Sequence, residues 1–173
     1  VGQIFCQWAK SLKLKLIGTV GSEEKIKLAK KYGCDEVINY SKEDFAKKVM
    51  EITNGEGVSV VYDGVGKSTF DKSIECLKLR GTMVSFGNAS GALDPIVVSK
   101  SLQPKGIYFV RPAMMQYLIT REEIEEASNM LFKQISSGKV KIEIYKKYKL
   151  EEVIQAHKDL EGRKIIGPAV IIP

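Results

Sequence analysis

The residues that end one apolar segment form the most informative chemical pattern in this 173-residue chain. The run Leu14–Val20 is followed by Gly21 and Ser22, and Lys25 comes three residues later. Strands that contact the ribose of a dinucleotide usually end in Asp or Glu, which binds the 2′-hydroxyl. A hydroxyl and an ammonium in place of that carboxylate suit a 2′-phosphate. Tyr40, which ends the next apolar run, could add a second hydroxyl.

The same residues also have a purely structural interpretation. Ser22 could only cap the helix that follows, Lys25 could be a solvated lysine, and Tyr40 a partly buried aromatic residue. Glu23 and Glu24 count against a bound phosphate, although acids in a first helical turn also complement the helix dipole. The spacing alone therefore leaves both interpretations open.

Glycine clusters end two further apolar runs. Asp63-Gly64-Val65-Gly66 ends the run that begins at Val58, and Phe86-Gly87-Asn88 ends the run that begins at Gly81. Glycines at these points would let a flat ring and a ribose lie close to the backbone. Ordinary turns use the same residues, so these clusters could equally be ligand-binding loops or plain turns.

Apolar periodicity predicts alternating strands and helices over the first 110 residues. We expect strands at 14–20, 36–40, 58–65, 81–87 and 106–110, and helices at 2–12, from Ser22 to Gly33, after a Ser41–Asp44 capping box, and at 68–79. The strands are almost continuously apolar, as parallel strands buried on both faces are. The pattern predicts an α/β fold with a Rossmann-type doubly wound parallel sheet. Val1-Gly2 would be the tail of a glycine-rich turn that holds a pyrophosphate, so the first strand is expected to precede Val1.

The alternation changes after Pro112. We expect a helix at 120–137 capped by Thr120, a strand at 139–144, a helix at 150–160 and a strand at 165–172, with an inward face on the first helix made of Ile124, Ala127, Met130, Leu131 and Ile135. The predicted domains are a dinucleotide-binding domain at 1–118 and a tail at 119–173. This tail would pack on that domain and complete a catalytic domain missing from the sequence.

Composition favours some classes of protein over others. Cys6, Cys34 and Cys76 are widely spaced and His157 is the only histidine, which argues against a disulfide framework and a metal site and fits a reducing cytoplasm. No apolar run approaches the ~18 residues of a membrane span. The net charge of +6 comes from lysines scattered among acids, which favours a solvated surface over nucleic-acid binding.

Several stretches resemble one family, the zeta-crystallin-like, zinc-free NADPH-dependent quinone oxidoreductases of the medium-chain dehydrogenases. The resemblance extends over the whole chain and is carried by residues 18–22, 37–40, 60–66, 83–91 and 120–123, of which 83–91 is the most specific. Members bind NADPH and transfer hydride to quinone or enone acceptors without zinc, and they carry an N-terminal catalytic domain. The resemblance therefore implies a truncated reductase that is inactive, or nearly so, by itself.

The resemblance also implies roles for particular residues. It assigns 2′-phosphate contacts to Ser22, Lys25 and Tyr40. Together with Val1 and Gly21, which the strand-and-turn pattern indicates, the predicted cofactor-binding residues are Val1, Gly21, Ser22, Lys25, Tyr40, Val65, Phe86, Gly87, Asn88, Ser90, Phe109, Val110, Arg111 and Arg163. Ala89 stands where relatives are expected to carry Ser, which puts one hydroxyl contact in doubt. The edge strand 106–110 resembles the one through which such enzymes form homodimers. No catalytic residue is expected in this part.

Three other functions compete with this interpretation. One is a non-catalytic nucleotide-binding or structural protein, as crystallin-like relatives imply. Another is a different doubly wound enzyme, such as a methyltransferase, which would not need Lys25 and Tyr40 beside the second strand. The third is nucleic-acid binding, prompted by the charge of +6 and opposed by the scattered lysines.

Overall fold

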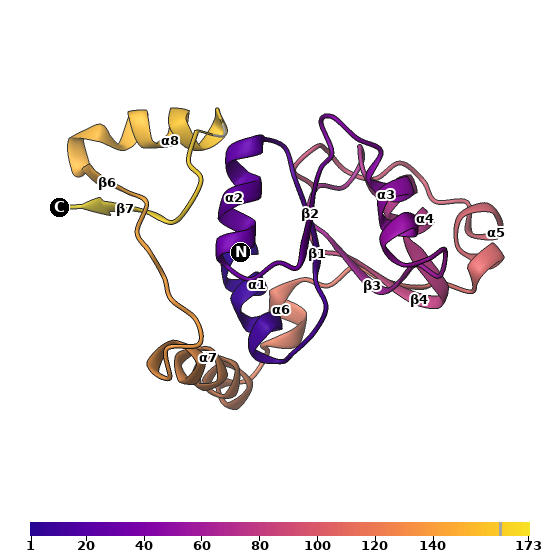
Figure 1. Ribbon diagram of the computed structural model, residues 1–173. Coiled ribbons are helices and arrows are strands. Elements are labelled where there is room, and N and C mark those ends of the chain that lie inside the picture. The colour runs from indigo at the N-terminus through magenta and orange to yellow at the C-terminus, as the bar shows by residue number, and fades with distance from the viewer. Residues whose placement is uncertain (163) are drawn as a thin grey trace. The chain divides into compact units, whose positions relative to one another are not determined.

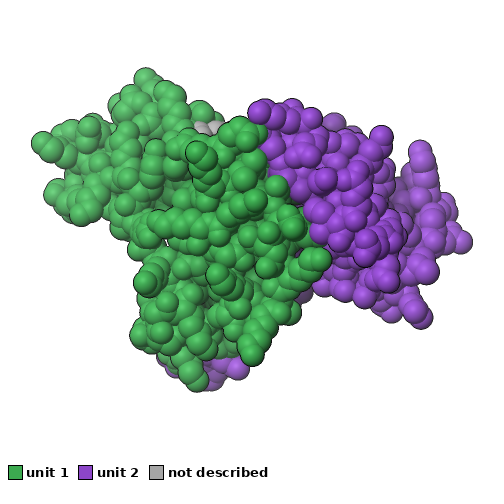
Figure 2. Space-filling model, in the orientation of Figure 1, with its two compact units in different colours: residues 1–37, 128–173 green, residues 38–127 purple. Residues whose placement is uncertain are grey.

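The computed structural model describes residues 1–162 and 164–173 (Figure 1). The chain forms two compact units, which Figure 2 shows in different colours: unit 1 comprises residues 1–37 and 128–173, and unit 2 comprises residues 38–127. The fold is α/β, and the strand registers that can be followed in both units are parallel. The expected fold class is therefore confirmed.

Unit 1 begins with an alternation of helices and strands. Its first elements are α1 (Gly2–Ser11), β1 (Ile17–Val20), α2 (Glu23–Lys31) and the start of β2 (Glu36–Asn39), and β1 pairs with β2. Gly33 ends α2 with a φ of 98°, as expected of a glycine after a helix. The strand predicted at 14–20 begins only at Ile17, because Lys13 turns into the left-handed region and the Leu14 amide bonds back to Ala9.

The C-terminal part of unit 1 contains the end of α7 (Arg121–Ser136), β6 (Lys146–Lys149), a 3-10 turn η2 (Leu150–Glu152), α8 (Val153–Glu161) and β7 (Ala169–Ile172). Strands β6 and β7 are parallel and pair Lys146 with Ala169 through Lys149 with Ile172. The strand predicted at 139–144 is absent from the described residues. Instead, the Gln7 side chain bonds to both the amide and the carbonyl of Lys141, so a side chain replaces the neighbouring strand.

Unit 2 is built around a three-stranded parallel sheet of order β3-β4-β5. Its elements are α3 (Phe45–Ile52), β3 (Val58–Asp63), α4 (Phe70–Glu75), β4 (Leu77–Ser85), α5 (Val98–Ser101), a 3-10 turn η1 (Gln103–Lys105), β5 (Tyr108–Val110), α6 (Met114–Tyr117) and the start of α7. The core packs Phe70, Ile74, Leu77, Met83 and Ile107. Because Asp63 pairs with Ser85 and Val84 with Val110, the strands end at a common edge.

Two expectations for unit 2 were wrong in detail. The helix predicted at 68–79 ends at Glu75, where the Lys105 ammonium donates to the carbonyls of Glu75 and Leu77, both at 2.7 Å. Leu77 is then free to enter β4, where its side chain is fully buried. The N-cap of α3 is Asp44, whose carboxylate accepts hydrogen bonds from the amides of Ala46 and Lys47. The prediction that a capping box begins at Ser41 is therefore wrong.

Helix α7 follows its predicted bounds and cap. The Thr120 hydroxyl accepts from the Glu123 amide, and the Glu123 carboxylate accepts from the amides of Ile119 and Thr120. The inward face was wrong in part, because Ile124 and Met130 are 43% and 54% exposed. Among the described residues, no helix is both long and apolar enough to cross a membrane.

Candidate functional site

The turn after β3 is organised by the carboxylate of Asp63. Asp63 is 5% exposed, and one of its oxygens accepts from the amides of Val65 at 2.8 Å and Gly66 at 3.0 Å. The other oxygen accepts from the hydroxyls of Thr69 and Ser73, both at 2.8 Å. All four donors belong to the turn or to α4, so this one side chain fixes the path of the backbone at the end of the strand.

The loop after β4 is bonded directly to this turn. The Ser90 hydroxyl donates to the Val65 carbonyl at 2.8 Å and accepts from the Ser68 amide at 3.0 Å. A methyl group on Gly87 would overlap the carbonyl and Cα of Gly64, so the two backbones touch at their glycines. The glycines predicted to admit a ligand therefore also serve this close packing of loop against loop.

The end of β5 is tied to the same loop by a guanidinium. Arg111 donates to the Ser85 carbonyl at 2.6 Å. The Asn88 amide, oriented to satisfy both of its ends, accepts from Arg111 at 3.3 Å and donates to the Gly87 carbonyl at 2.8 Å. The ends of β3, β4 and β5 are thus linked by the side chains of Ser90 and Arg111, which were predicted to bind the cofactor.

The structure brings most of the predicted site residues of unit 2 to one edge of the sheet. Val65, Gly87 and Ser90 lie in the two bonded loops, and Asn88 and Arg111 are exposed beside them. Phe86 is 43% exposed, and its ring lies against Gly64, where an added methyl would come 2.9 Å from the ring. In parallel α/β sheets ligands bind outside the carboxyl ends of the strands, which is where these residues are.

One predicted residue has its side chain elsewhere. Phe109 lies within β5, and its ring packs edge-on against Phe70 with 6.1 Å between centroids. Phe109 therefore contributes to the core of unit 2, and Val110 is the last residue of the same strand. Of this segment only Arg111 extends beyond the strand.

The residues predicted to bind the 2′-phosphate lie at the ends of β1 and β2. Ser22 occupies the N-cap position of α2 with extended backbone, yet its hydroxyl makes no capping hydrogen bond. Lys25 is half-buried in the first turn of α2, and Gly21 precedes the cap. These three belong to unit 1, together with Val1 at the start of α1, whereas Tyr40 belongs to unit 2 and is 36% exposed. Arg163 lies outside the described residues.

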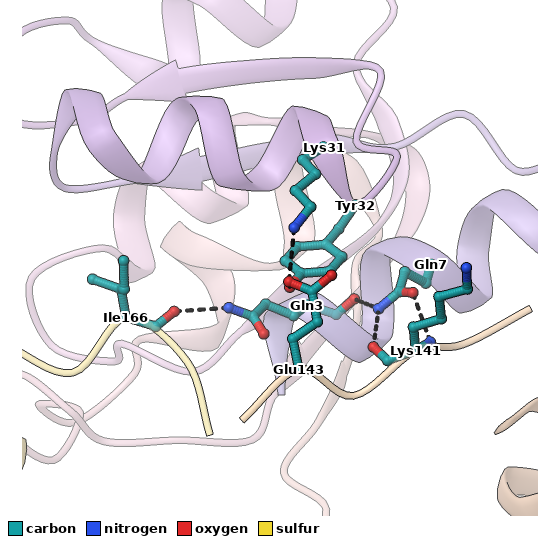
Figure 3. A network of polar contacts seen from close by, with 7 residues as sticks. All are labelled: Gln3, Gln7, Lys31, Tyr32, Lys141, Glu143 and Ile166. Carbon is teal, nitrogen blue, oxygen red and sulfur yellow. Dashed lines mark hydrogen bonds and ion pairs between the residues drawn. The ribbon is translucent and has the colours of Figure 1, made fainter. Parts of the chain in front are cut away.

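Unit 1 also contains a polar network that links α1 and α2 to the C-terminal part of the chain (Figure 3). Gln3 donates to the Ile166 carbonyl at 2.7 Å, while Gln7 holds Lys141. Glu143 accepts from the Lys31 ammonium at 2.7 Å and the Tyr32 hydroxyl at 3.1 Å, and these contacts hold its pKa below the usual range. The network is structural, and a pocket of about 290 Å³ beside it contains none of the predicted cofactor residues.

No group of three or more His, Cys, Asp or Glu side chains in the described part of the chain could hold a metal ion. The single histidine, His157, lies in α8. The described residues therefore do not supply the ligands of a zinc site.

The parallel strands and the bonded loops at their ends place the chain among the doubly wound α/β proteins. It belongs to the zinc-binding dehydrogenase family, whose model matches residues 1–133. Among individual proteins, it is 47% identical to quinone oxidoreductase 1 of Escherichia coli over all of this chain and 54% of that protein. It is 45% identical to 2-haloacrylate reductase of a Burkholderia species, of which it covers 52%. The resemblance to quinone oxidoreductases seen in the sequence is confirmed.

Solved structures agree with these relatives. The Escherichia coli quinone oxidoreductase complexed with NADPH matches all of this chain and 54% of that chain, with a TM-score of 0.96 and 47% identity. The quinone oxidoreductase of Pseudomonas syringae matches with a TM-score of 0.95 at 40% identity and covers 53% of that chain. The chain thus spans about half the length of the relatives that it matches.

The sequence reasoning missed the residues that position the loops. The sequence pattern predicts Asp63 only as part of a turn and predicts no role for Thr69 or Ser73. The available signal was a carboxylate at the last position of a strand, followed by Gly-x-Gly and then by two hydroxyl residues one helical turn apart. A buried carboxylate must find donors, and this stretch offers backbone amides and two hydroxyls within one helical turn of each other.

Proposed function

We propose that this chain is the nucleotide-binding portion of an NADPH-dependent oxidoreductase that reduces quinone or enone acceptors. The observation that carries the proposal is the 0.96 TM-score, at 47% identity over the whole chain, to a quinone oxidoreductase complexed with NADPH. The bonded glycine loops at the ends of β3 and β4 support it, because they lie where an α/β sheet binds its ligand. The proposed domains are residues 1–118 for the nucleotide and 119–173 for the tail.

The cofactor residues of unit 2 would act by position. Bound NADPH supplies the hydride, and the protein orients it. The backbone at Gly87 and Val65 is fixed by Asp63 and Ser90, so a ring lying on these loops would meet a surface with few ways to move. The exposed ring of Phe86 and the exposed amide of Asn88 would give that surface one apolar and one polar contact. In this proposal the side chains of this chain position the cofactor and transfer no proton.

The residues of unit 1 would select the phosphorylated cofactor. The Ser22 hydroxyl makes no capping bond, so it can donate to a phosphate at the N-terminus of α2, where the helix dipole also favours an anion. Lys25 lies one turn further on and would add a positive charge. Val1 and Gly21 are the other proposed contacts in unit 1. By resemblance, Tyr40 of unit 2 and Arg163, which lies outside the described residues, are proposed as further contacts.

Zinc independence, a homodimer and a cytoplasmic location are also proposed. The dimer would form through the segment 106–110, since β5 is the end strand in the β3-β4-β5 order and Tyr108 is 65% exposed. The cytoplasmic location agrees with three cysteines that are all free thiols. The non-catalytic alternative is not favoured, because the relatives that match the whole chain are named as oxidoreductases.

The test uses the full-length natural protein and follows NADPH oxidation. We expect turnover with a simple quinone, and a much slower rate with NADH in place of NADPH. A second candidate substrate class is the activated alkene, which the 45% identity to 2-haloacrylate reductase favours. Faster turnover of 2-haloacrylate than of quinones would move the proposal to that class. NADPH binding without turnover of either class would overturn the catalytic proposal.

A further inference from the structure

The pocket of about 290 Å³ in unit 1 lies where α1 and α2 end, apart from every residue assigned to the cofactor. Its lining comes from α1, from the end of α2 and from the segment after α7, and consists of Gln7, Lys10, Ser11, Lys31, Tyr32 and Lys139. Three of these described lining residues are lysines and none of them is acidic. We call this hollow the lysine pocket.

Only part of the positive charge in the lysine pocket is neutralised within the described residues. Lys31 donates to the Glu143 carboxylate at 2.7 Å, and the Tyr32 hydroxyl donates to the same oxygen at 3.1 Å (Figure 3). Lys10 and Lys139 are exposed and form no ion pair in the part of the chain that the structure describes. Three ammonium groups therefore surround the pocket, and one carboxylate balances them.

The lysines are not needed to cap the helices that end at the pocket. The carbonyls of each last turn already accept from the backbone amides that follow, namely those of residues 12–14 after α1, 32–34 after α2, and 137, 138 and 140 after α7. The ends of α1 and α2 each act as roughly half a negative charge. Together with Glu143 they offset about two of the three lysine charges, so the pocket remains positive.

Backbone contacts bring the lysines together. A methyl group on Gly33 would overlap the side chain of Lys10, so the aliphatic part of Lys10 lies directly across this glycine at the end of α2. Gln7, one turn before Lys10 on α1, accepts from the Lys141 amide at 2.8 Å and donates to the Lys141 carbonyl at 3.0 Å. This pair of hydrogen bonds holds the segment that carries Lys139 beside α1.

We propose that the lysine pocket binds a small phosphorylated compound. Lysine binds phosphate as a point charge, and each ammonium has three donors, so Lys31 can contact Glu143 and a ligand together. Ammonium groups from three segments suit the several oxygens of a phosphate better than the two oxygens of a planar carboxylate. The pocket is close to the lower end of the range of about 300–1,000 Å³ for ligand sites, which favours a ligand much smaller than a dinucleotide. The site does not depend on the proposed reductase activity.

The first experiment titrates the full-length natural protein with glycerol 3-phosphate by calorimetry at low ionic strength. We expect one site per chain, and the double variant Lys10→Gln/Lys139→Gln should bind about tenfold more weakly or worse, because it removes two charged donors. Lys30→Gln is the matched control, since Lys30 is the exposed neighbour of Lys31 on α2 and lies outside the lining. Lys30→Gln and Lys25→Ala should each change the affinity by less than about twofold. An equal loss with Lys30→Gln would overturn the proposal, because it would show attraction to the overall charge only.

Inorganic phosphate and succinate test the class of ligand. Inorganic phosphate should compete for the same lysines, and its affinity relative to glycerol 3-phosphate measures what the organic part adds. Succinate should bind several-fold more weakly than glycerol 3-phosphate. Succinate binding as tight as that of glycerol 3-phosphate would overturn the assignment to phosphate, and so would the absence of binding by both phosphate compounds.

A second experiment needs no variant and compares the rates at which acetic anhydride acetylates individual lysines of the natural protein. With saturating glycerol 3-phosphate, mass spectrometry should show that Lys10, Lys31 and Lys139 react several-fold more slowly. Lys30 should react at the same rate with and without the ligand. Unchanged rates at the three pocket lysines would contradict the proposed site even if calorimetry detects binding elsewhere on the protein.

Discussion

Replacing Asp63 should loosen the strand-end loops and weaken cofactor binding together. Asp63→Ala removes the acceptor for two amides and two hydroxyls, all within 3.0 Å. A buried donor left without a partner costs about 1–3 kcal/mol. The hydroxyls can rotate, and that of Thr69 already has the Gly66 carbonyl as a second acceptor. The backbone amides of Val65 and Gly66 cannot rotate to another acceptor. With two unpaired donors, we expect the free energy of unfolding to fall by about 4 kcal/mol, within a range of roughly 2–6.

Asp63→Asn tests the same reasoning with a smaller change. The amide oxygen can still accept from Val65 and Gly66, while the amide nitrogen can no longer accept from Thr69 and Ser73. We expect a loss of about 2 kcal/mol, because hydrogen bonds to a charged group are worth about 1.5–3 kcal/mol each and the hydroxyls recover part of that.

Urea denaturation measures both losses in the full-length protein, and a fluorescence titration measures NADPH affinity. Asp71→Asn is the matched control, since Asp71 is an exposed carboxylate in the first turn of α4 and should change stability by less than about 1 kcal/mol. The reasoning about Asp63 would be refuted by an Asp63→Ala protein that unfolds at the same urea concentration as the Asp71→Asn control.

Three further predictions follow from other parts of the chain. Lys25→Ala should reduce the preference for NADPH over NADH about tenfold, the equivalent of about 1.4 kcal/mol, while Lys27→Ala, an exposed neighbour on α2, should leave it unchanged in paired titrations. Equal preference in both variants would contradict the 2′-phosphate assignment. Gly87→Ala should lower the stability by about 1–3 kcal/mol because its methyl would overlap Gly64, whereas Gly2→Ala, whose methyl meets nothing within 4 Å, should not, and denaturation midpoints decide between them. Asp159, whose pKa is lowered to about 2 first by the Tyr148 hydroxyl and then by Lys146, should stabilise the fold above pH ~4 and lose that contribution as the pH falls towards about 2. Asp159→Asn should flatten the acid limb of a stability–pH profile, and an unchanged limb would show that other groups produce it.

The helices and strands that the sequence predicted best are those whose ends are set by their own residues. Gly33 ends α2, and Thr120 begins α7, because a glycine after a helix and a hydroxyl before one act within a few residues. The parallel α/β class was likewise predictable, since nearly continuous apolar strands need cover on both faces. Local rules were sufficient in each of these places.

The predictions failed where a distant side chain satisfied the backbone. Lys105 ends α4 early by binding its last carbonyls, although it lies 30 residues further along the chain. Gln7 takes the place of a neighbouring strand for Lys141, at a sequence separation of 134. Neither partner can be read from the periodicity of the segment that it changes, because the periodicity describes only the faces of that segment. Such contacts require the tertiary structure.

At the candidate site, too, part of the structure could be predicted from the sequence and part could not. The loops that would hold a nicotinamide could be found from their glycines, because close approach of a ring or of another backbone demands the same absent side chain. The sequence could not show whether a given glycine makes room for a ring or for another backbone segment. Gly87 contacts Gly64, and the Ser90 hydroxyl donates a hydrogen bond to the Val65 carbonyl. Both residues therefore determine the conformation of the loops in the ligand-free protein. A rigid pair of loops would lose less freedom when a cofactor binds. On the proposed assignment, the packing of these residues in the free protein would therefore also contribute to cofactor affinity.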